Sequence, residues 1–328
     1  MRRSAERKGH CAVKAASIAF GALLAVATTG SARAEDTLRL AIGQRGLWNT
    51  CISEVGQRAG IFRKHGLNLE ILYTQGSGET QQAAIAGSVD IAVGVGIMGA
   101  LSAYGKGAPV RIIGAETRGA GDLFWYVKAD SPIRTLQEAD GKTIAYSTNG
   151  SSTHGVVTAF IKQYVPHAKA TATGGPAATL TAVMSGQVDV GWAGPPFGLD
   201  QLDRKEIRQF ATGNDTLFKG QTVRVLVTTA PTLASRRDAI ERYMAGYRET
   251  LDWLYADPAA LDVYAEFAGI TRAKAARTRD QFFPKSAILP DEITGLDLII
   301  PDAIELKFIN AAPTQQQLAE LIQIPPRK

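Results

Sequence analysis

The sequence lacks an excess of one charge over most of its length. It contains 36 lysine and arginine residues and 31 aspartate and glutamate residues, for a formal net charge of +5. Six of the basic residues and one of the acidic residues lie in the first 34 positions, so residues 35–328 carry 30 of each sign. A neutral body has no overall field to attract a nucleic acid or an anionic membrane surface, and we expect neither as a partner.

Cysteine and histidine are also scarce. Beyond position 34 the only cysteine is Cys51, and the histidines are His65, His154 and His167. One cysteine forms no internal disulfide and no thiol zinc cluster, and no two of these histidines have metal-ligand spacing. We therefore expect no metal and no cofactor. The fold must be held by its core, since a chain of this size buries about 75% of its unfolded surface.

Long apolar runs are missing except near the N-terminus. There, a basic start is followed by an uncharged run over residues 15–27 and by Ala32-Arg33-Ala34, a small-x-small cleavage pattern. The run is too short to span about 30 Å of hydrocarbon. We expect residues 1–34 to be a signal peptide, cleaved near Ala34 after export by the Sec or the twin-arginine route. The remaining protein would be periplasmic, monomeric and without a membrane-spanning segment.

What the sequence does contain is a regular alternation of short apolar strands and amphipathic helices. A helix is expected over residues 50–65, ending before Gly66, and another over residues 236–255 with an apolar stripe. This alternation predicts an α/β fold with a mostly parallel sheet. The expected strands cover residues 37–42, 67–73, 89–93, 110–113 and 142–146.

An internal repeat indicates that the α/β unit is duplicated. Residues 76–91 match residues 175–190 at an offset of 99, each copy reading as a glycine turn, a helix, a glycine stop and a short strand. The offset is longer than the 20–50 residues of solenoid repeats, so we expect two lobes. Extended segments at residues 123–128 and 223–228 are the expected crossings. The predicted boundaries give lobe I residues 35–124 and 226–328, and lobe II residues 125–225.

Three glycine- and hydroxyl-rich loops each follow a strand and precede a helix, at residues 76–78, 149–153 and 174–176. Glycine lets the backbone approach a ligand, hydroxyl groups donate hydrogen bonds, and a helix N-terminus favours an anion. The alternative is that these residues only cap helices. Ligands of open α/β sheets bind beyond the carboxyl ends of strands, so two facing lobes would bring the loops together across a cleft.

Two patterns favour an enzyme instead. Gly94-x-Gly96-x-x-Gly99 follows a strand, and Glu116 lies 20 residues beyond Gly96, which is the spacing of a dinucleotide site. The motif, however, follows the third expected strand and not the first, and export removes the chain from the nicotinamide pool. His154, which follows Ser151, Ser152 and Thr153, suggests a Ser–His pair as a second candidate, although residues this close in sequence point their side chains in different directions. We expect no catalytic residue.

The segments at residues 46–48, 59–70, 76–80 and 86–90 resemble the nitrate/sulfonate/taurine and thiamine-pyrimidine family of ABC-transporter solute-binding proteins. The resemblance implies a two-lobe, type II periplasmic-binding-protein fold that closes like a hinge on a small organic anion or related metabolite and passes it to a membrane permease. The alternative is a secreted enzyme of the same fold. Matched to the family motifs, the ligand-binding residues would be Gln44, Trp48, Gly76, Ser77, Gly78, Asn149, Ser151, Ser152, Thr153, Trp192, Gly194 and Pro195.

The residues themselves add further candidates. Gly175 is a candidate because it lies in the glycine-rich loop at residues 174–176. Arg118 is a candidate because it lies just beyond the strand at residues 110–113, where its charge could pair with an oxyanion. Glu116 or Asp122 could hold an amine. We expect Trp48 and Trp192 to form apolar walls of the cleft, the alternative being that they fill the lobe cores.

Overall fold

The five expected strands and others pair into two sheets that share one strand order. The computed structural model describes residues 35–327, so the predicted signal peptide lies outside the described residues. The first sheet has the order β2-β1-β3-β10-β4, in which β10 alone is antiparallel to its neighbours. Its strands are β1 (Asp36–Gly43), β2 (Leu67–Thr74), β3 (Ile91–Gly96), β4 (Val110–Arg118) and β10 (Thr222–Thr229).

Strands from the middle of the chain repeat this order. β5 is antiparallel to β8 and β9, β6 is parallel to β7, and a parallel bridge between Ile144 and Val190 joins β6 to β8. The order is therefore β7-β6-β8-β5-β9, again with one antiparallel strand in fourth place. The strands are β5 (Phe124–Lys128), β6 (Thr143–Tyr146), β7 (Lys169–Ala172), β8 (Gly191–Ala193) and β9 (Ile207–Thr212).

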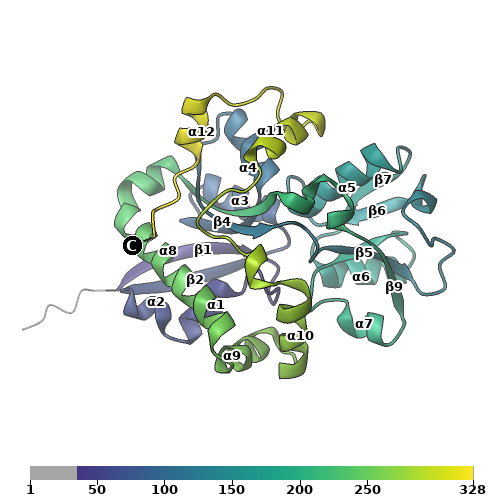
Figure 1. The fold of residues 1–328 in the computed structure, drawn as a ribbon, viewed down its shortest axis with the longest axis horizontal. Helices are drawn as coiled ribbons and strands as arrows, with labels where there is room; N and C mark the ends of the chain where they lie inside the picture. Colours follow the sequence, from purple (N-terminus) through teal and green to yellow (C-terminus); the bar gives the residue numbers. More distant parts are fainter. Residues whose placement is uncertain (1–34, 328) are drawn as a thin grey trace, which may run out of the picture. The chain divides into compact units, whose positions relative to one another are not determined.

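We call the first sheet with its helices lobe I and the second lobe II (Figure 1). The chain crosses between them at residues 119–123 and 213–221. The segments expected to be crossings, residues 123–128 and 223–228, instead lie almost entirely within β5 and β10. Their apolar side chains are buried because each supplies the antiparallel strand of its sheet.

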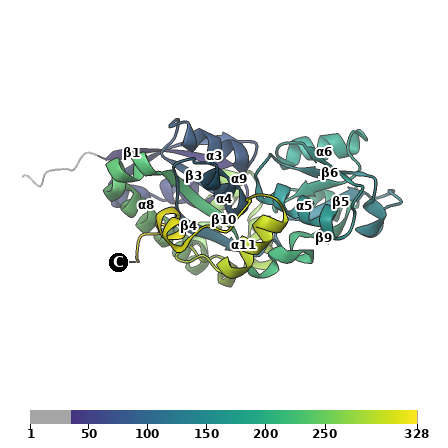
Figure 2. The same cartoon turned by 90° about the horizontal axis from the view of Figure 1, so that it is seen from above.

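Helices cover both faces of the lobe I sheet (Figure 2). The helices on one face surround a core that contains Ile52, Phe62 and Ile240, while those on the other bury Ala84 and Leu101. The first group is α1 (Ile52–Arg58), α2 (Ile61–Lys64), α8 (Ala230–Ala256) and α9 (Ala259–Ala268), and the second is α3 (Ser77–Ile85) and α4 (Ile97–Gly105).

Two expected helices differ in detail. The helix expected over residues 50–65 is divided into α1 and α2, because Gly60 takes a left-handed conformation at φ 74°. The helix expected to begin at Arg236 is continuous with an earlier turn, and Arg236 itself marks a kink at φ −129° and ψ 25°. The predicted stripe is buried as expected and consists of Ile240, Tyr243, Met244, Tyr247, Leu251 and Leu254.

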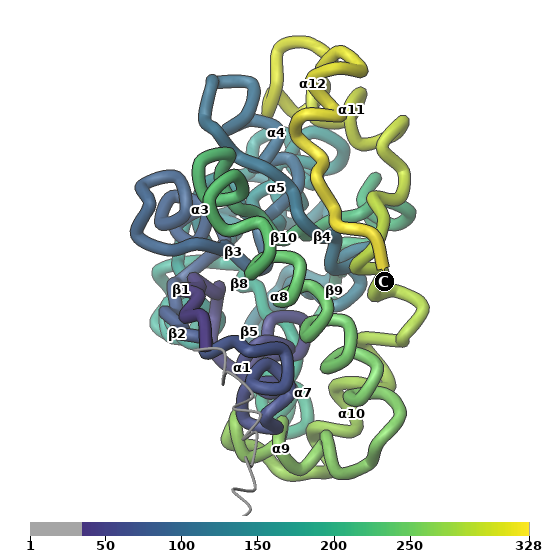
Figure 3. Tube along the Cα trace, turned by 90° about the vertical axis from the view of Figure 1, so that its left-hand side faces the viewer, coloured from purple at the N-terminus to yellow at the C-terminus, as the bar shows by residue number. Residues whose placement is uncertain are grey.

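The remaining helices complete lobe II and the C-terminal region. The last segment returns along lobe I, where Ile322 forms a parallel bridge with Ile112 of β4 (Figure 3). Lobe II holds α5 (Ser152–Gln163), α6 (Pro176–Met184) and α7 (Leu199–Asp203), and the C-terminal region holds α10 (Arg272–Phe282), α11 (Leu296–Glu305) and α12 (Gln315–Leu321). Single 3-10 turns lie at Gln137–Ala139, Gly213–Asp215, Leu217–Gly220 and Lys285–Ala287.

The duplication predicted from the repeat extends to individual hydrogen bonds. α3 and α6 have identical lengths at the offset of 99. Across the turn into α3 the hydroxyls of Thr74 and Thr80 lie 2.7 Å apart, and across the turn into α6 those of Thr173 and Thr179 lie 2.6 Å apart. Each lobe therefore presents the same strand–turn–helix unit.

Candidate functional site

The glycine-rich loop of lobe I meets lobe II directly. The Gly78 N–H donates to Thr148 Oγ1 over 3.0 Å, and a Cβ built on Gly78 would lie 2.1 Å from the Asn149 carbonyl oxygen. A Cβ built on Gly76 would lie 2.5 Å from Thr148 Oγ1. The predicted loops at residues 76–78 and 149–153 are thus brought together, and glycine is required at position 78 because the two backbones touch there.

The GxGxxG motif makes a second contact of the same kind. A Cβ on Gly99 would lie 2.2 Å from the Gly150 carbonyl oxygen, and a Cβ on Gly96 would lie 2.8 Å from the Ser152 backbone nitrogen. Lobe II backbone fills the space that a dinucleotide phosphate would need above these glycines. The glycines of the motif therefore allow the two lobes to pack closely against each other.

Gln44 and Gly175 form a third contact. Gln44 Nε2 donates to the Gln75 carbonyl over 2.7 Å, and Gln75 Oε1 accepts from the Gly175 N–H over 3.3 Å. Gln44 itself has a left-handed backbone at φ 45°. These residues link the loop after β1, the loop after β2 and the start of α6.

The hydroxyl groups of the loop at residues 149–153 bond mainly to one another. Thr153 Oγ1 accepts from the Ser147 N–H over 2.9 Å and lies 2.9 Å from Ser151 Oγ. Ser151 caps α5 by accepting from the His154 N–H, while Asn149 Oδ1 accepts from the Tyr146 hydroxyl. Helix capping was the alternative to ligand binding that the sequence left open for this loop, and it is the observed role of Ser151.

Gly194 and Pro195 lie where lobe II meets the loop after β1. A Cβ on Gly194 would lie 3.3 Å from Leu47 Cδ2 and 3.8 Å from the Asp122 carbonyl oxygen. Phe197, three residues on, lies 3.6 Å from the Cβ position of Gly46. The contact therefore involves the segment that follows β8, in which the sequence analysis predicted Gly194 and Pro195 as ligand-binding residues.

Trp48 and Trp192 are both fully buried but differ in their hydrogen bonds. Trp48 lies in the lobe I core, donates its indole N–H to the Tyr255 hydroxyl over 3.1 Å and makes an edge contact with Tyr264. This is the core-filling alternative that the sequence left open. Trp192, in β8, has an indole N–H without a partner among the described residues.

A buried group of charged and polar residues lies at the end of the lobe I sheet. Arg224 of β10 forms a bidentate pair with Asp122, at 2.8 and 3.2 Å, and also donates to Thr117 over 2.9 Å. Glu116 is completely buried on the neighbouring strand β4, and Asn49 Nδ2 donates to its Oε2 over 3.4 Å. Of these residues the sequence had suggested Glu116 and Asp122 as holders of an amine.

Burial raises the pKa of Glu116 to about 8, because the carboxylate is removed from water. The nearby Arg224 guanidinium and the Asn49 hydrogen bond oppose the rise, while the charge of Asp122 adds to it. A group that titrates near neutral pH in a buried polar cluster is a candidate for function. The sequence missed Asn49 and Arg224; a lone arginine inside the apolar strand VRVLVT was the available signal for a buried ion pair.

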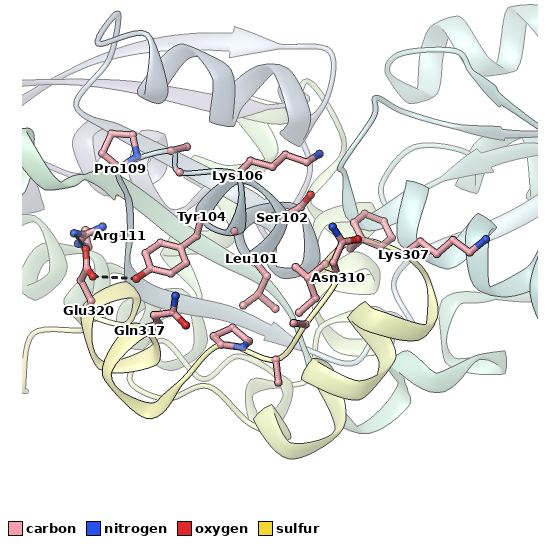
Figure 4. A pocket seen from close by; sticks show the side chains of 18 residues that line it. Leu101, Ser102, Tyr104, Lys106, Pro109, Arg111, Lys307, Asn310, Gln317 and Glu320 are labelled. Atoms are coloured by element: carbon pink, nitrogen blue, oxygen red, sulfur yellow. Dashed lines mark hydrogen bonds and ion pairs between the residues drawn. The ribbon is translucent and has the colours of Figure 1, made fainter.

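Arg118 is separated from these loops. Its side chain is exposed at the end of β4 and lines a pocket of about 380 Å³ beside the first crossing, together with Asn214 and Phe283. The larger groove of about 740 Å³ in Figure 4 lies between the end of α4 and the segment before α12, and Lys106 and Arg111 line it. It contains none of the predicted site residues.

Within residues 35–327, no group of three or more histidine, cysteine, aspartate or glutamate side chains is arranged to hold a metal ion. No helix of the same residues is long and apolar enough to cross a membrane.

The sequence profile of the NMT1/THI5-like family matches residues 52–261, well over half of the chain. The chain belongs to the NMT1/THI5-like family. Comparison with curated proteins gives no match.

Solved structures share the fold of this NMT1/THI5-like protein. The periplasmic aliphatic sulphonate binding protein SsuA from Escherichia coli has a TM-score of 0.66 at 19% identity, covering 89% of this chain and 93% of that one. The alkanesulfonate-binding protein SsuA from Xanthomonas axonopodis pv. citri, bound to MOPS, has a TM-score of 0.67 at 16% identity, covering 87% and 98%. The nitrate-binding protein NrtA from Synechocystis PCC 6803 has a TM-score of 0.66 at 14% identity, covering 87% and 84%. The type II periplasmic-binding-protein fold expected from the sequence is confirmed.

Proposed function

We propose that this protein is the solute-binding component of an ABC importer. It captures a small organic anion or related metabolite, of the sulfonate, nitrate, taurine or pyrimidine-precursor type, and passes it to a membrane permease. The observation that carries the proposal is the direct contact of the two lobes through glycines at positions 76, 78, 96 and 99. Such contacts suit a pair of lobes that close on a ligand and open to release it.

The site residues of the proposal are those at the facing edges of the lobes. Gln44 from lobe I and Ser152 from lobe II lie at the contacts described above. Ser77 is buried between Gly76 and Gly78, and Trp192 retains an unpartnered donor. Backbone N–H groups at the starts of α3 and α5 add donors that suit a polar ligand.

An enzyme of the same fold is the second candidate. Its two sequence patterns have structural roles here, which favours binding without reaction. His154 Nδ1 accepts from the Gly150 N–H over 3.1 Å, and the Ser151 hydroxyl caps α5, so neither group activates the other. The glycines of the GxGxxG motif pack against lobe II.

A ligand screen by thermal unfolding tests the function. Residues 35–328 would be heated with sulfonates, carboxylates, nitrate and pyrimidines in turn. A ligand present at 100 times its Kd adds about 2.7 kcal/mol to the free energy of unfolding, which raises Tm by a few degrees. The ligand should be recovered unchanged after incubation, and conversion to a product would favour the enzyme.

The proposal includes export. Cleavage after Ala34 would release a periplasmic monomer, in keeping with the Ala32-Arg33-Ala34 pattern. N-terminal sequencing of the exported protein should begin at Glu35, and a sequence that begins at Met1 would contradict cleavage.

A further inference from the structure

Two buried oxygen atoms, on side chains that contact each other, have no hydrogen-bond partner among the described residues. They are Glu116 Oε1 and Asn49 Oδ1. The orientation of the Asn49 amide follows from its neighbour: Nδ2 faces Glu116 Oε2 at 3.4 Å, and the opposite orientation would set two acceptors against each other. When Glu116 is ionised, both unpartnered atoms are acceptors, so neither can satisfy the other.

The neighbouring cation is already engaged. Arg224 donates hydrogen bonds from Nη1 and Nη2 to the Asp122 carboxylate, and from Nη1 also to the Thr117 hydroxyl. Glu116 therefore has one oxygen bonded to Asn49 and the other without a donor. Leaving a buried acceptor unmatched is unfavourable, more so when the group is charged, so the site is suited to an incoming donor.

The position of this pair is the one at which α/β folds bind ligands. Asn49 lies in the loop after β1, and Glu116 lies near the carboxyl end of β4. Gly94, in β3, approaches Glu116 and the residue that follows Asn49: its Cβ position is 3.8 Å from Glu116 Oε2 and 3.0 Å from Thr50 Cγ2. β1, β3 and β4 run in one direction and end together, and ligands bind beyond such carboxyl ends.

We propose that Glu116 and Asn49 accept hydrogen bonds from an N–H group of the bound solute, so that the solute is a small amine, amidine or amino-substituted heterocycle. This inference rests on the proposed solute-binding function and narrows its ligand class. An oxyanion alone offers only acceptors and would leave the buried Asn49 Oδ1 without a donor. A solute with both an oxyanion and an amine remains suited to the site, because the starts of α3 and α5 can receive the anionic end.

The test uses pairs of probes that differ by one amino group. The pairs are taurine with ethanesulfonate, β-alanine with propionate, and 4-aminopyrimidine with pyrimidine. Isothermal titration calorimetry would measure each against residues 35–328. The expected result is that at least one amino compound binds ten times more tightly, or more, than its amine-free partner.

Variants then assign the preference to Glu116. Glu116→Gln keeps the shape of the side chain and should weaken the preferred amino compound at least tenfold, leaving the amine-free partner within twofold. Asn49→Ala should weaken the same compound and provides a second reading if Glu116→Gln does not fold. Glu266→Gln, which removes a charge from an exposed side chain of α9, is the matched control and should change neither Kd.

Three results would overturn the inference. The amine-free compounds could bind as tightly as their amino partners, or Glu116→Gln could lower the affinity of both members of a pair equally or of neither. The third is that no amino compound binds. Either of the first two results would mean that water or packing alone, and not the solute, satisfies Glu116 and Asn49. If oxyanions bind without any effect of Glu116, the inference fails and the solute-binding function stands. If no small molecule from the wider screen binds, the proposed function fails as well.

Discussion

The α-carbon of Gly99 in lobe I faces the carbonyl of Gly150 in lobe II so closely that a methyl group on Gly99 would lie 2.2 Å from the carbonyl oxygen. Gly99 lies inside helix α4, where glycine is usually unfavourable compared with alanine. Its presence is explained by the contact between the lobes.

Gly99→Ala should therefore hold the lobes apart without unfolding lobe I. We expect ligand affinity to fall at least tenfold by calorimetry, while the free energy of unfolding changes by less than about 1 kcal/mol, because alanine favours the helix. Gly105→Ala, at the end of the same helix, is the control, since its Cβ would make only an ordinary 3.9 Å contact with Ile309. Equal affinities in both variants would show that binding does not require this contact.

Thr153 and Ser77 should respond differently to loss of their hydroxyls. The Thr153 hydroxyl is buried and bonded to Ser147 and Ser151, so Thr153→Ala should lower the free energy of unfolding by about 1–3 kcal/mol. Ser77→Ala should leave stability within about 0.5 kcal/mol and weaken ligand binding. Chemical denaturation and calorimetry on both variants check this, and a reversed pattern would reassign the two roles.

Trp192→Phe tests whether the indole N–H reaches the ligand. Phenylalanine keeps most of the buried ring, and the lost N–H has no protein partner, so stability should fall only modestly, by about 1 kcal/mol. Affinity should fall five- to thirtyfold. Trp48→Phe removes an N–H that bonds to Tyr255 and should instead lower stability with little effect on affinity. Unchanged affinity in Trp192→Phe would place Trp192 in the core alone.

The pH dependence of stability should reveal Glu116. Its pKa is raised from 4.5 to about 8 by burial, so the folded protein holds one more proton than the unfolded chain between these values. The stability that Glu116 contributes is highest below pH 4.5, falls as pH rises and levels off above pH 8, by up to ~5 kcal/mol in total. Denaturation from pH 5 to 9 should show this decline in the wild type and a flatter profile in Glu116→Gln. Parallel profiles would contradict a buried, protonated Glu116.

Local patterns in the sequence predicted β1, β2, β3, β4 and β6, the strand–turn–helix unit that is duplicated, and the buried stripe of α8, because each depends on residues close in sequence. β7 and β9 were not predicted. The strand expected at residues 37–42 is β1, extended by one residue at each end. Two features depended on distant parts of the chain and were not predictable locally. The segments at 123–128 and 223–228 are strands because each pairs with the sheet of the lobe that the chain has just entered. Apolar composition alone does not distinguish such a strand from a crossing segment.

The site was predictable in outline only. The glycine loops are brought together as the repeat predicted, but that they touch one another depends on the fit of two lobes. Trp48 is enclosed by Tyr255 and Tyr264, more than 200 residues away, so its environment was not visible in its own loop. The ligand-binding roles of Gln44, Ser77 and Trp192 stay predictions.

Closure of the lobes on a small solute is measured most directly by the distance between them. Leu72 in lobe I and Met184 in lobe II have exposed side chains and would be replaced by cysteine for spin labelling, while Cys51 is buried and should remain unlabelled. Electron–electron double resonance should show a shorter and narrower distance distribution when the best compound of the ligand screen is added, and the same compound should be recovered unreacted. A distribution that does not change although the compound binds, or consumption of the compound, would contradict capture by lobe closure.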